Sequence, residues 1–247
     1  MKNLIYLFLL LPQMFLAQTG FEKGNELYRK NQFQEAVQQY ELVFKTNKQS
    51  AELYFNLGNS YYKLNKVAPA IYNFEKALLL KPNDKDILNN LAFAQKMQID
   101  EVKEVPEVGF GKVLTNLTSS RHYNYWAWVA VFSSFFILLF FIGYYFSYRT
   151  ILKRVFFGGM FVSVLVLGLA IFAAISEKNN DLLFRPAIVF DEVLEVKAEP
   201  KPDAPNAFVL HEGTKVEVKE DLDNWRRIAL ADGTDGWIKS GSIKELK

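Results

Sequence analysis

The side chains in this sequence that could do chemistry are mainly amides, cations and aromatic rings. Nine of them would share one surface if residues 18–98 form pairs of helices: Asn25, Tyr28, Arg29, Phe55, Asn56, Asn59, Tyr62, Lys63 and Asn90. Asparagine amides can bond the main chain of an extended peptide, and Arg29 or Lys63 can meet a carboxylate. The sequence therefore predicts a polypeptide-binding surface, unless these residues only form solvated helix faces.

Catalytic and metal-binding patterns are missing from the sequence. The chain of 247 residues has no cysteine, which excludes disulfides, zinc–thiolate sites and thiol nucleophiles. Its two histidines lie far apart, and His211 beside Glu212 is interpreted as a surface pair next to a turn. A net charge of only +2 gives no electrostatic case for nucleic acid. We predict no enzyme, no cofactor, no metal site and no nucleic-acid partner.

Residues 51–84 form a unit of 34 residues with two helical stripes. The residues that mark the stripes are Tyr54, Leu57, Gly58, Tyr61 and Leu64, then Ala70, Phe74 and Ala77. This spacing resembles a tetratricopeptide repeat, whose period is 34 residues. Shifting by one period aligns Gly24 with Gly58 and Ala36 with Ala70, whereas after Leu91 no second helix follows. Residues 18–98 are thus predicted to be an all-α solenoid of two repeats plus a capping helix.

The resemblance implies that the first helix of each pair lines a concave groove for a peptide or a partner helix. Some members of the family hold a C-terminal carboxylate with two cations. Asn25 and Asn56 fit that pattern, but Phe21 and Asn90 replace the basic residues, so this clamp is not carried over. Two repeats are few for independent stability, so a partner or self-association is expected to complete the module.

Residues 1–17 have the pattern of a secretory signal peptide. Lys2 precedes an apolar core, and Ala17 offers a small residue at the exit. The alternative is an uncleaved anchor, but the apolar residues before Pro12 are too few to span about 30 Å of hydrocarbon.

Two later segments are long and apolar enough to span a lipid bilayer, 126–148 and 155–175. Aromatic residues lie at both ends of the first, as in interfacial belts. In the second, Gly158, Gly159 and Gly168 are expected to allow close helix contact. Neither segment has a polar face, which makes a buried hairpin of a soluble protein the weaker alternative.

The short segment 149–154 between them is predicted to be a cytoplasmic loop that sets the topology. Arg149, Lys153 and Arg154 obey the positive-inside rule. A signal peptide and two spans would then leave both flanking regions on the periplasmic side of the inner membrane.

Two connecting stretches complete the N-terminal and central parts of the chain. Residues 99–125 are interpreted as a linker in which Phe110, Val113, Leu114 and Leu117 have helical spacing. This stretch is either an ordinary linker or holds a short helix on the outer membrane face. Residues 176–186 are interpreted as a second linker.

Residues 187–247 change to short β-rich runs separated by proline and glycine turns, which predicts five or six strands in a small all-β barrel. The pattern resembles a bacterial SH3-like domain through Leu210, Gly213, Thr214, Val216, Trp225, Gly233, Gly236, Trp237 and Ile238. Relatives of this kind bind cell-wall peptides or proteins. Trp225 is either a binding aromatic or a residue of the core or rim, and Trp237 is predicted to lie in the core.

The order of these parts resembles BatE proteins of the Bacteroides aerotolerance (Bat) group. The resemblance implies partnership with other Bat membrane proteins bearing von Willebrand factor A domains, and with a MoxR-type AAA+ ATPase. It also implies a role in aerotolerance or envelope stress. The sequence thus favours a membrane-anchored scaffold, and the alternative is an envelope sensor whose SH3-like domain binds peptidoglycan.

Overall fold

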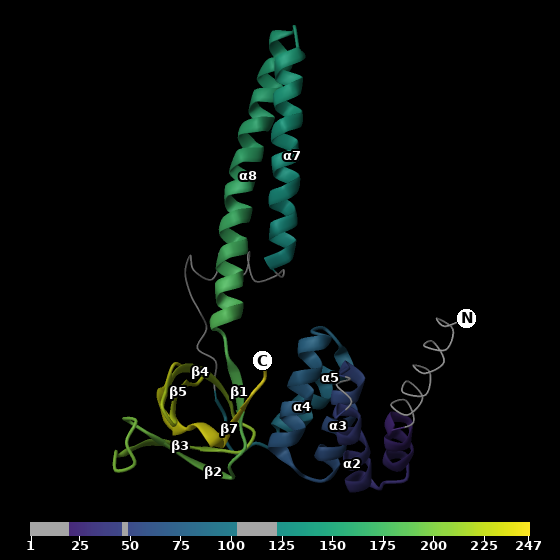
Figure 1. Cartoon of the computed structure of the whole chain (residues 1–247), viewed down its shortest axis with the longest axis vertical. Helices are drawn as coiled ribbons and strands as arrows, with labels where there is room; N and C mark the ends of the chain where they lie inside the picture. The colour runs from purple at the N-terminus through teal and green to yellow at the C-terminus, as the bar shows by residue number, and fades with distance from the viewer. Residues whose placement is uncertain (1–19, 46–48, 103–122) are drawn as a thin grey trace, which may run out of the picture. The chain divides into compact units, whose positions relative to one another are not determined.

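The protein is described by a computed structural model that covers residues 20–45, 49–102 and 123–247. These residues fall into two compact units (Figure 1). One unit combines the described parts of Met1–Glu104 and Arg185–Lys247, and the other holds the described part of Val105–Phe184. The predicted signal peptide 1–17 and the predicted interfacial residues from Phe110 to Leu117 lie outside the described residues.

Helical pairs build the N-terminal part of the first unit. Residues 20–29 are helical, and they are followed by α2 (Phe33–Phe44), α3 (Ala51–Lys63), α4 (Val67–Leu80) and α5 (Lys85–Gln95). Asn31 and Asn65, one period apart, take left-handed φ values of 59° and 55° in the turns between paired helices. Asparagine tolerates that conformation better than most residues, so both pairs can turn in the same way. The predicted two pairs plus a capping helix are confirmed as a fold.

Glycine allows the two helices of each pair to approach closely. A Cβ atom on Gly24 would lie 2.4 Å from the Tyr40 ring, and one on Gly58 would lie 2.8 Å from the Phe74 ring. Because Tyr40 and Phe74 are themselves buried, neither ring has free space into which it could move. The repeated glycine is therefore required by packing. We refer to residues 20–102 as the repeat domain.

A seven-stranded antiparallel sheet forms the C-terminal part of the same unit. Its strands are β1 (Pro186–Val189), β2 (Val193–Lys197), β3 (Asn206–His211), β4 (Lys215–Leu222), β5 (Trp225–Ala229), β6 (Asp235–Lys239) and β7 (Ile243–Glu245). Their order is β3-β2-β6-β5-β4-β1-β7. Val196, Val218, Ile228 and Ile238 are among the side chains of its core. We refer to residues 185–247 as the sheet domain.

The sheet domain differs from the sequence prediction at two points. Five or six strands were expected, and β7 was missed because Ile243–Glu245 is too short to show an alternating pattern. Trp237, predicted to be a core residue, is only half-buried and lies outside the core cluster. Its neighbours Gly236 and Ile238 are the buried residues of β6. Because successive side chains of a strand point to opposite faces, Trp237 lies on the face of β6 that points away from the core.

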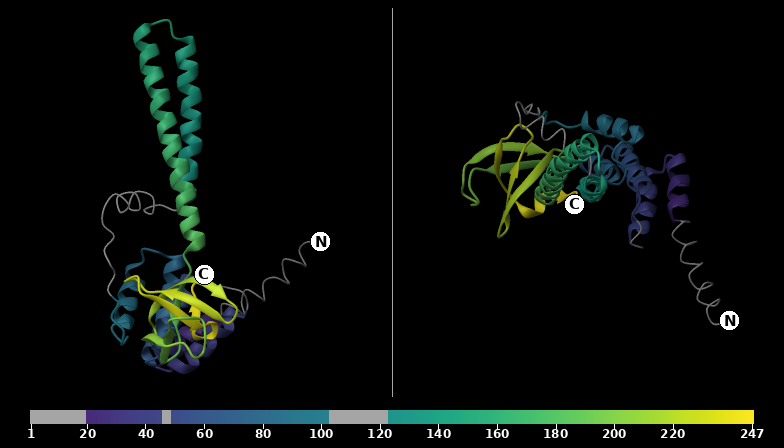
Figure 2. Two further views of the ribbon diagram at one scale, coloured as in Figure 1. Left: turned by 90° about the vertical axis from the view of Figure 1, so that its left-hand side faces the viewer. Right: turned by 90° about the horizontal axis from the view of Figure 1, so that it is seen from above.

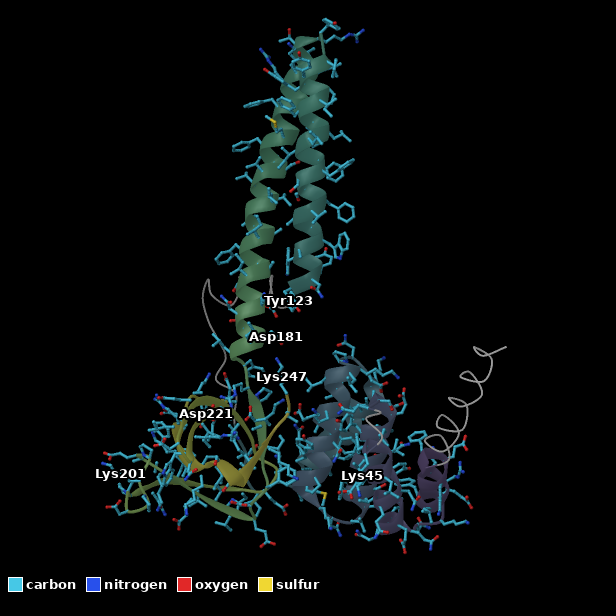
Figure 3. All side chains as sticks on the ribbon, viewed as in Figure 1. Lys45, Tyr123, Asp181, Lys201, Asp221 and Lys247 are labelled. Atoms are coloured by element: carbon cyan, nitrogen blue, oxygen red, sulfur yellow. The ribbon has the colours of Figure 1, made fainter. Side chains whose placement is uncertain are left out.

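The second unit is a pair of long apolar helices, α7 (Tyr123–Phe146) and α8 (Thr150–Leu183). They lie side by side in both views of Figure 2, and most of their side-chain atoms are carbon (Figure 3). Both are long and apolar enough to cross a membrane by length and composition. Large apolar side chains such as Phe135 and Phe161, about 60% and 59% exposed, point away from the helix pair.

The helix ends differ from the predicted segment ends. The predicted loop 149–154 is a shorter turn, because α8 begins at Thr150 and includes Lys153 and Arg154. Residues 176–183 of the predicted second linker continue the same helix. Hydropathy marks which part of a helix can lie in hydrocarbon, whereas polar residues can prolong the helix on both sides. Pro186 follows shortly after the end of α8, as is common where a helix stops.

Small residues bring α7 and α8 together, but not all of the predicted ones. A Cβ atom on Gly159 would lie 3.0 Å from the Phe140 ring, and one on Gly143 would lie 2.8 Å from the Phe156 ring. Gly158 and Gly168 have no such neighbour within 4 Å, so their predicted role in this contact is wrong. The sequence alone does not show which of the three glycines of α8 faces α7, because this depends on how the two helices are aligned along their length.

Candidate binding surfaces

The asparagines of the predicted groove bond one another across successive first helices. Asn56 Nδ2 donates to Asn25 Oδ1 at 2.8 Å, and Asn90 Nδ2 donates to Asn59 Oδ1 at 2.7 Å. Both pairs are 31 residues apart, which is one repeat less three residues. The structure thus brings four of the nine predicted residues together in two amide pairs.

A buried tyrosine fixes the orientation of the first amide. Tyr40 Oη donates to Asn25 Oδ1 at 2.7 Å, so this oxygen accepts two hydrogen bonds. Burial, and then the neighbouring Tyr28, raise the pKa of Tyr40 to about 12. Its hydroxyl therefore stays a donor at neutral pH, which leaves the Asn25 Nδ2 group turned away from Tyr40.

Hydrogen-bonding capacity remains on the amide pairs after these contacts. Within the described residues, Asn25 Nδ2 and Asn59 Nδ2 lack acceptors, and Asn56 Oδ1 and Asn90 Oδ1 lack donors. Two NH2 groups and two carbonyl oxygens can therefore bond the C=O and N–H groups of an extended peptide main chain.

Arg29 and Lys63 are the two cations among the nine predicted groove residues. Arg29 and Lys63 are exposed, and neither takes part in an ion pair within the part of the chain that the structure describes. By contrast, the nearby Lys30 is paired with Glu26. Arg29 and Lys63 could therefore receive an acidic group of a ligand.

The aromatic members of the predicted groove are partly structural. The Tyr28 ring meets Phe33 edge to face with centroids 5.2 Å apart, and the Phe55 ring lies 6.0 Å from the buried Phe74 ring. Tyr62 packs at the edge of the repeat core. All three remain half-buried, so each presents only part of its ring to a ligand.

Trp225 lines a pocket of about 330 Å³ on the sheet domain. Its other walls include Leu194 and Pro202, and the charged side chains Asp191, Glu195, Lys197 and Lys239 surround it. Trp225 is half-buried, which fits a residue that supports the pocket and also faces it. An aromatic ring among balanced charges suits a peptide better than a highly charged ligand.

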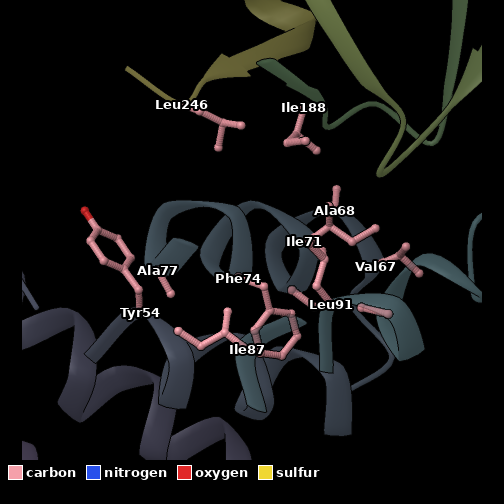
Figure 4. Close-up of a cluster of buried hydrophobic side chains, with 12 residues drawn as sticks. Tyr54, Val67, Ala68, Ile71, Phe74, Ala77, Ile87, Leu91, Ile188 and Leu246 are labelled. Atoms are coloured by element: carbon pink, nitrogen blue, oxygen red, sulfur yellow. The ribbon is translucent and has the colours of Figure 1, made fainter. Parts of the chain in front are cut away.

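The repeat domain and the sheet domain share a hydrophobic core (Figure 4). Ile188 of β1 and Leu246, 0% and 1% exposed, belong to the cluster that contains Ile71, Phe74 and Ala77 of α4. This contact covers one side of α4 with residues that lie more than 100 positions later in the chain. The sequence predicted that a partner or self-association would complete the short solenoid, and here the chain supplies its own cover.

Gly213 lets the sheet domain approach α4 closely. Its φ of 88° is left-handed, and a Cβ atom would lie 3.0 Å from Val67 and 3.1 Å from Ile71. Glycine satisfies both constraints at once. The sequence pattern singled out Gly213 as a turn residue of the sheet, but only the structure shows its contact with the repeats.

Polar contacts surround this shared core. Lys215 Nζ lies 2.8 Å from both carboxylate oxygens of Glu75, whose side chain is only 11% exposed. Lys76 Nζ donates to the carbonyl oxygen of Leu246 at 2.9 Å. The buried Glu75 carboxylate would be costly without its lysine, so the pair selects this arrangement over slipped ones.

Asp100 contributes the densest set of these contacts. Its carboxylate accepts from the Thr214 hydroxyl at 2.7 Å and from the His211 backbone N–H at 2.6 Å, and it lies 2.8 Å from His211 Nδ1. The interpretation of His211 and Glu212 as a mere surface pair is therefore wrong, since Glu212 also accepts from the Ala68 backbone N–H. Asp100 was placed in a linker because its partners lie more than 100 residues away.

The matches to known families agree with this architecture. A tetratricopeptide repeat family matches residues 51–84, and a TPR repeat family matches residues 24–65. A bacterial SH3 domain family matches residues 193–245. The chain thus contains tetratricopeptide repeats and a bacterial SH3 domain, as the sequence predicted.

Similarity to a curated protein is confined to a short region. The human (Homo sapiens) protein O-mannosyl-transferase TMTC1 is 29% identical over 91 residues, which is 36% of this chain. The chain spans 10% of the length of that relative.

We expect the contact made by Asp100 to depend on pH. Burial tends to raise the pKa of Asp100, but hydrogen bonds from Thr214 and His211 outweigh it and hold the pKa below its ordinary value. A depressed pKa adds stability above the unfolded value of about 3.9, and this stability is lost as the pH falls through the folded pKa. Asp100→Asn should therefore cost about 1–3 kcal/mol of unfolding free energy at pH 7, where hydrogen bonds to a charged group are lost.

Chemical denaturation of the full chain in detergent, at pH 7 and at pH 3, measures this effect. The gap between wild type and Asp100→Asn should shrink at pH 3, because the unfolded wild-type carboxylate, with a pKa of about 3.9, then binds a proton more readily than the folded one. A gap of equal size at both pH values would show that the carboxylate charge has no such role.

Proposed function

We propose that the chain is a non-enzymatic, membrane-anchored scaffold whose repeats bind an extended, acidic segment of a partner protein. The observation that carries this proposal is the pair of asparagine–asparagine bonds, Asn25–Asn56 and Asn59–Asn90. They fix the orientation of four amides and, among the described residues, leave two NH2 groups and two carbonyl oxygens for a ligand main chain. Arg29 and Lys63, which have no ion-pair partner among the described residues, support an acidic segment as the ligand.

The partners that we propose are other Bat-type membrane proteins with von Willebrand factor A domains, acting with a MoxR-type AAA+ ATPase. Support comes from the order of parts along the chain: helical repeats, two apolar helices and a bacterial SH3 domain. Both matched domain families serve protein interaction, which suits a role in assembling such a complex. Its biological setting would be aerotolerance or envelope stress.

The proposed location is the inner membrane, with the repeat and sheet domains on the periplasmic side. The repeat and sheet domains share a hydrophobic core, and two domains on opposite sides of a membrane could not pack together. This supports an even number of membrane crossings by the chain between them. Arg149, Lys153 and Arg154 favour a cytoplasmic turn between α7 and α8. The signal-peptide pattern in residues 1–17 supports the same orientation.

A second candidate function is an envelope sensor whose SH3-like domain binds peptidoglycan. The observation that favours it is the pocket beside Trp225, which is open to ligands independently of the repeat groove. In this alternative the repeats relay binding to a partner through the shared core. Retention of the chain on purified murein, and its loss in Trp225→Ala, would favour the sensor over the scaffold.

Reversal of one groove charge should weaken partner binding. With a photo-crosslinking residue at the exposed position 22, one helical turn before Asn25, Lys63→Glu should lower capture of the partner in intact cells by about tenfold, the equivalent of 1.4 kcal/mol. Lys45→Glu is the matched control, because it makes the same charge change on an exposed residue outside the groove set. Equal capture by both variants would remove the acidic-segment hypothesis.

The topology can be tested on a cysteine-free background, because the natural sequence contains no cysteine. Tyr148 is fully exposed in the turn between α7 and α8, and Lys201 is exposed in the sheet domain. In spheroplasts, a membrane-impermeant maleimide should label Lys201→Cys but should label Tyr148→Cys only after permeabilisation. The reverse pattern would contradict the proposed orientation.

A further inference from the structure

A second pocket lies where the repeat domain meets the sheet domain, and it uses none of the nine groove residues. Its volume is about 290 Å³, and its walls come from α2, α3, α4 and the segments around Phe190 and Lys244. Ligand sites are commonly found at such junctions and usually span roughly 300–1,000 Å³. A pocket at the lower limit of that range suits one side chain rather than a whole cofactor.

Aromatic rings form most of the apolar lining. Phe44 and Tyr54 are tilted against each other with centroids 4.9 Å apart. Tyr72 of α4 meets Phe190 of the sheet domain edge to face, with centroids 5.7 Å apart. The rings are thus held in place by one another before any ligand arrives, which lowers the entropic cost of binding.

Hydrogen-bonding groups in the lining remain available. Asn73 is 95% buried, because its exposed fraction is 5%, and its Nδ2 donates to the Pro69 carbonyl at 2.8 Å. Within the described residues, its Oδ1 lacks a donor, and the Tyr54 and Tyr72 hydroxyls lack partners. The amide oxygen and the two hydroxyls, all from residues of the pocket lining, can receive a hydroxyl or ring N–H of a ligand.

The charges around the pocket decide between classes of ligand. Lys244 Nζ lies 4.1 Å from the Phe190 ring centroid, and Lys76 Nζ lies 5.8 Å from that of Tyr54. A cationic ligand would meet Lys244 in the pocket lining, and like-charge contacts cost several kcal/mol. A cation–π contact returns only about 0.5–2 kcal/mol. An anionic ligand would meet Glu41, whose carboxylate already accepts from Tyr61 Oη at 2.7 Å.

We propose that this pocket binds one neutral aromatic side chain, of the tyrosine or tryptophan type, from a partner polypeptide. Ring stacking and edge contacts supply the affinity, and Asn73 Oδ1 receives the polar hydrogen of the ligand. Because Tyr72 and Phe190 belong to different domains, an occupied pocket also stabilises the contact between the repeats and the sheet domain. The pocket shares no residue with the proposed groove, so an experiment can contradict one proposal without contradicting the other.

Photo-labelling of the full chain in lipid nanodiscs tests the site. The probe is N-acetyl-tyrosinamide with a photoreactive diazirine on its ring, and labelled positions are found by mass spectrometry. We expect label on the peptides that contain Tyr54, Tyr72 and Phe190. N-acetyl-tryptophanamide should reduce it at least twofold, and N-acetyl-argininamide at the same concentration should not.

Three variants make the test specific. Tyr72→Ala should lower labelling about tenfold and Tyr72→Phe should keep most of it. Phe93→Ala truncates an exposed ring of α5 that belongs neither to the pocket nor to the groove set, and it should leave labelling unchanged. Lys244→Gln should turn N-acetyl-argininamide into a competitor, a gain that misfolding cannot produce. The proposal is overturned by label confined to α7 and α8, by equal labelling of Tyr72→Ala, or by equal competition from the arginine derivative in the wild type.

Discussion

The burial of Ile188 and Leu246 against α4 is the contact on which the rest of the structure depends. It joins two segments that the long apolar helices α7 and α8 separate in sequence, and so makes one compact unit of the repeat and sheet domains. Two helical repeats alone leave one side of α4 in contact with water. The sheet domain covers this side within the same chain, and the contact involves none of the nine residues of the predicted groove.

Magnitudes indicate which interactions hold this unit together and which only orient it. Fully burying an isoleucine or leucine side chain contributes about 1.5–3 kcal/mol each, so these two residues dominate. The Glu75–Lys215 pair contributes less, because Lys215 is 44% exposed and its charge is partly screened. Its value lies in specificity, since a displaced sheet domain would leave Glu75 buried without a partner. Asp100, with three contacts to Thr214 and His211, has the same orienting effect at the end of the repeats.

The sequence predicted the features that depend on local pattern and missed those that depend on distant neighbours. The period that relates Gly24 to Gly58 predicted the helical pairs, because close packing repeats with the chain. No periodicity connects Asp100 to Thr214, and the apparent linker therefore hid an interdomain contact. Among the groove residues, sequence placed the asparagines on successive first helices, but their mutual bonds follow from the offset between those helices. The sequence did not predict the polar ends of α8, because hydropathy identifies the segment that can lie in hydrocarbon and not the residues where the helix begins and ends.

Cross-linking of Asp100→Cys/Thr214→Cys in native membranes tests the shared core most directly. The two side chains lie 2.7 Å apart at their oxygen atoms, and the natural chain has no other thiol. We expect mild oxidation to join them within one chain, as a linked peptide seen by mass spectrometry. A control that pairs Asp100→Cys with the exposed Leu222→Cys should stay unlinked. If both thiols of the test variant remained open to alkylation after oxidation, residues 100 and 214 would not be neighbours, and the account of one compact unit would be contradicted.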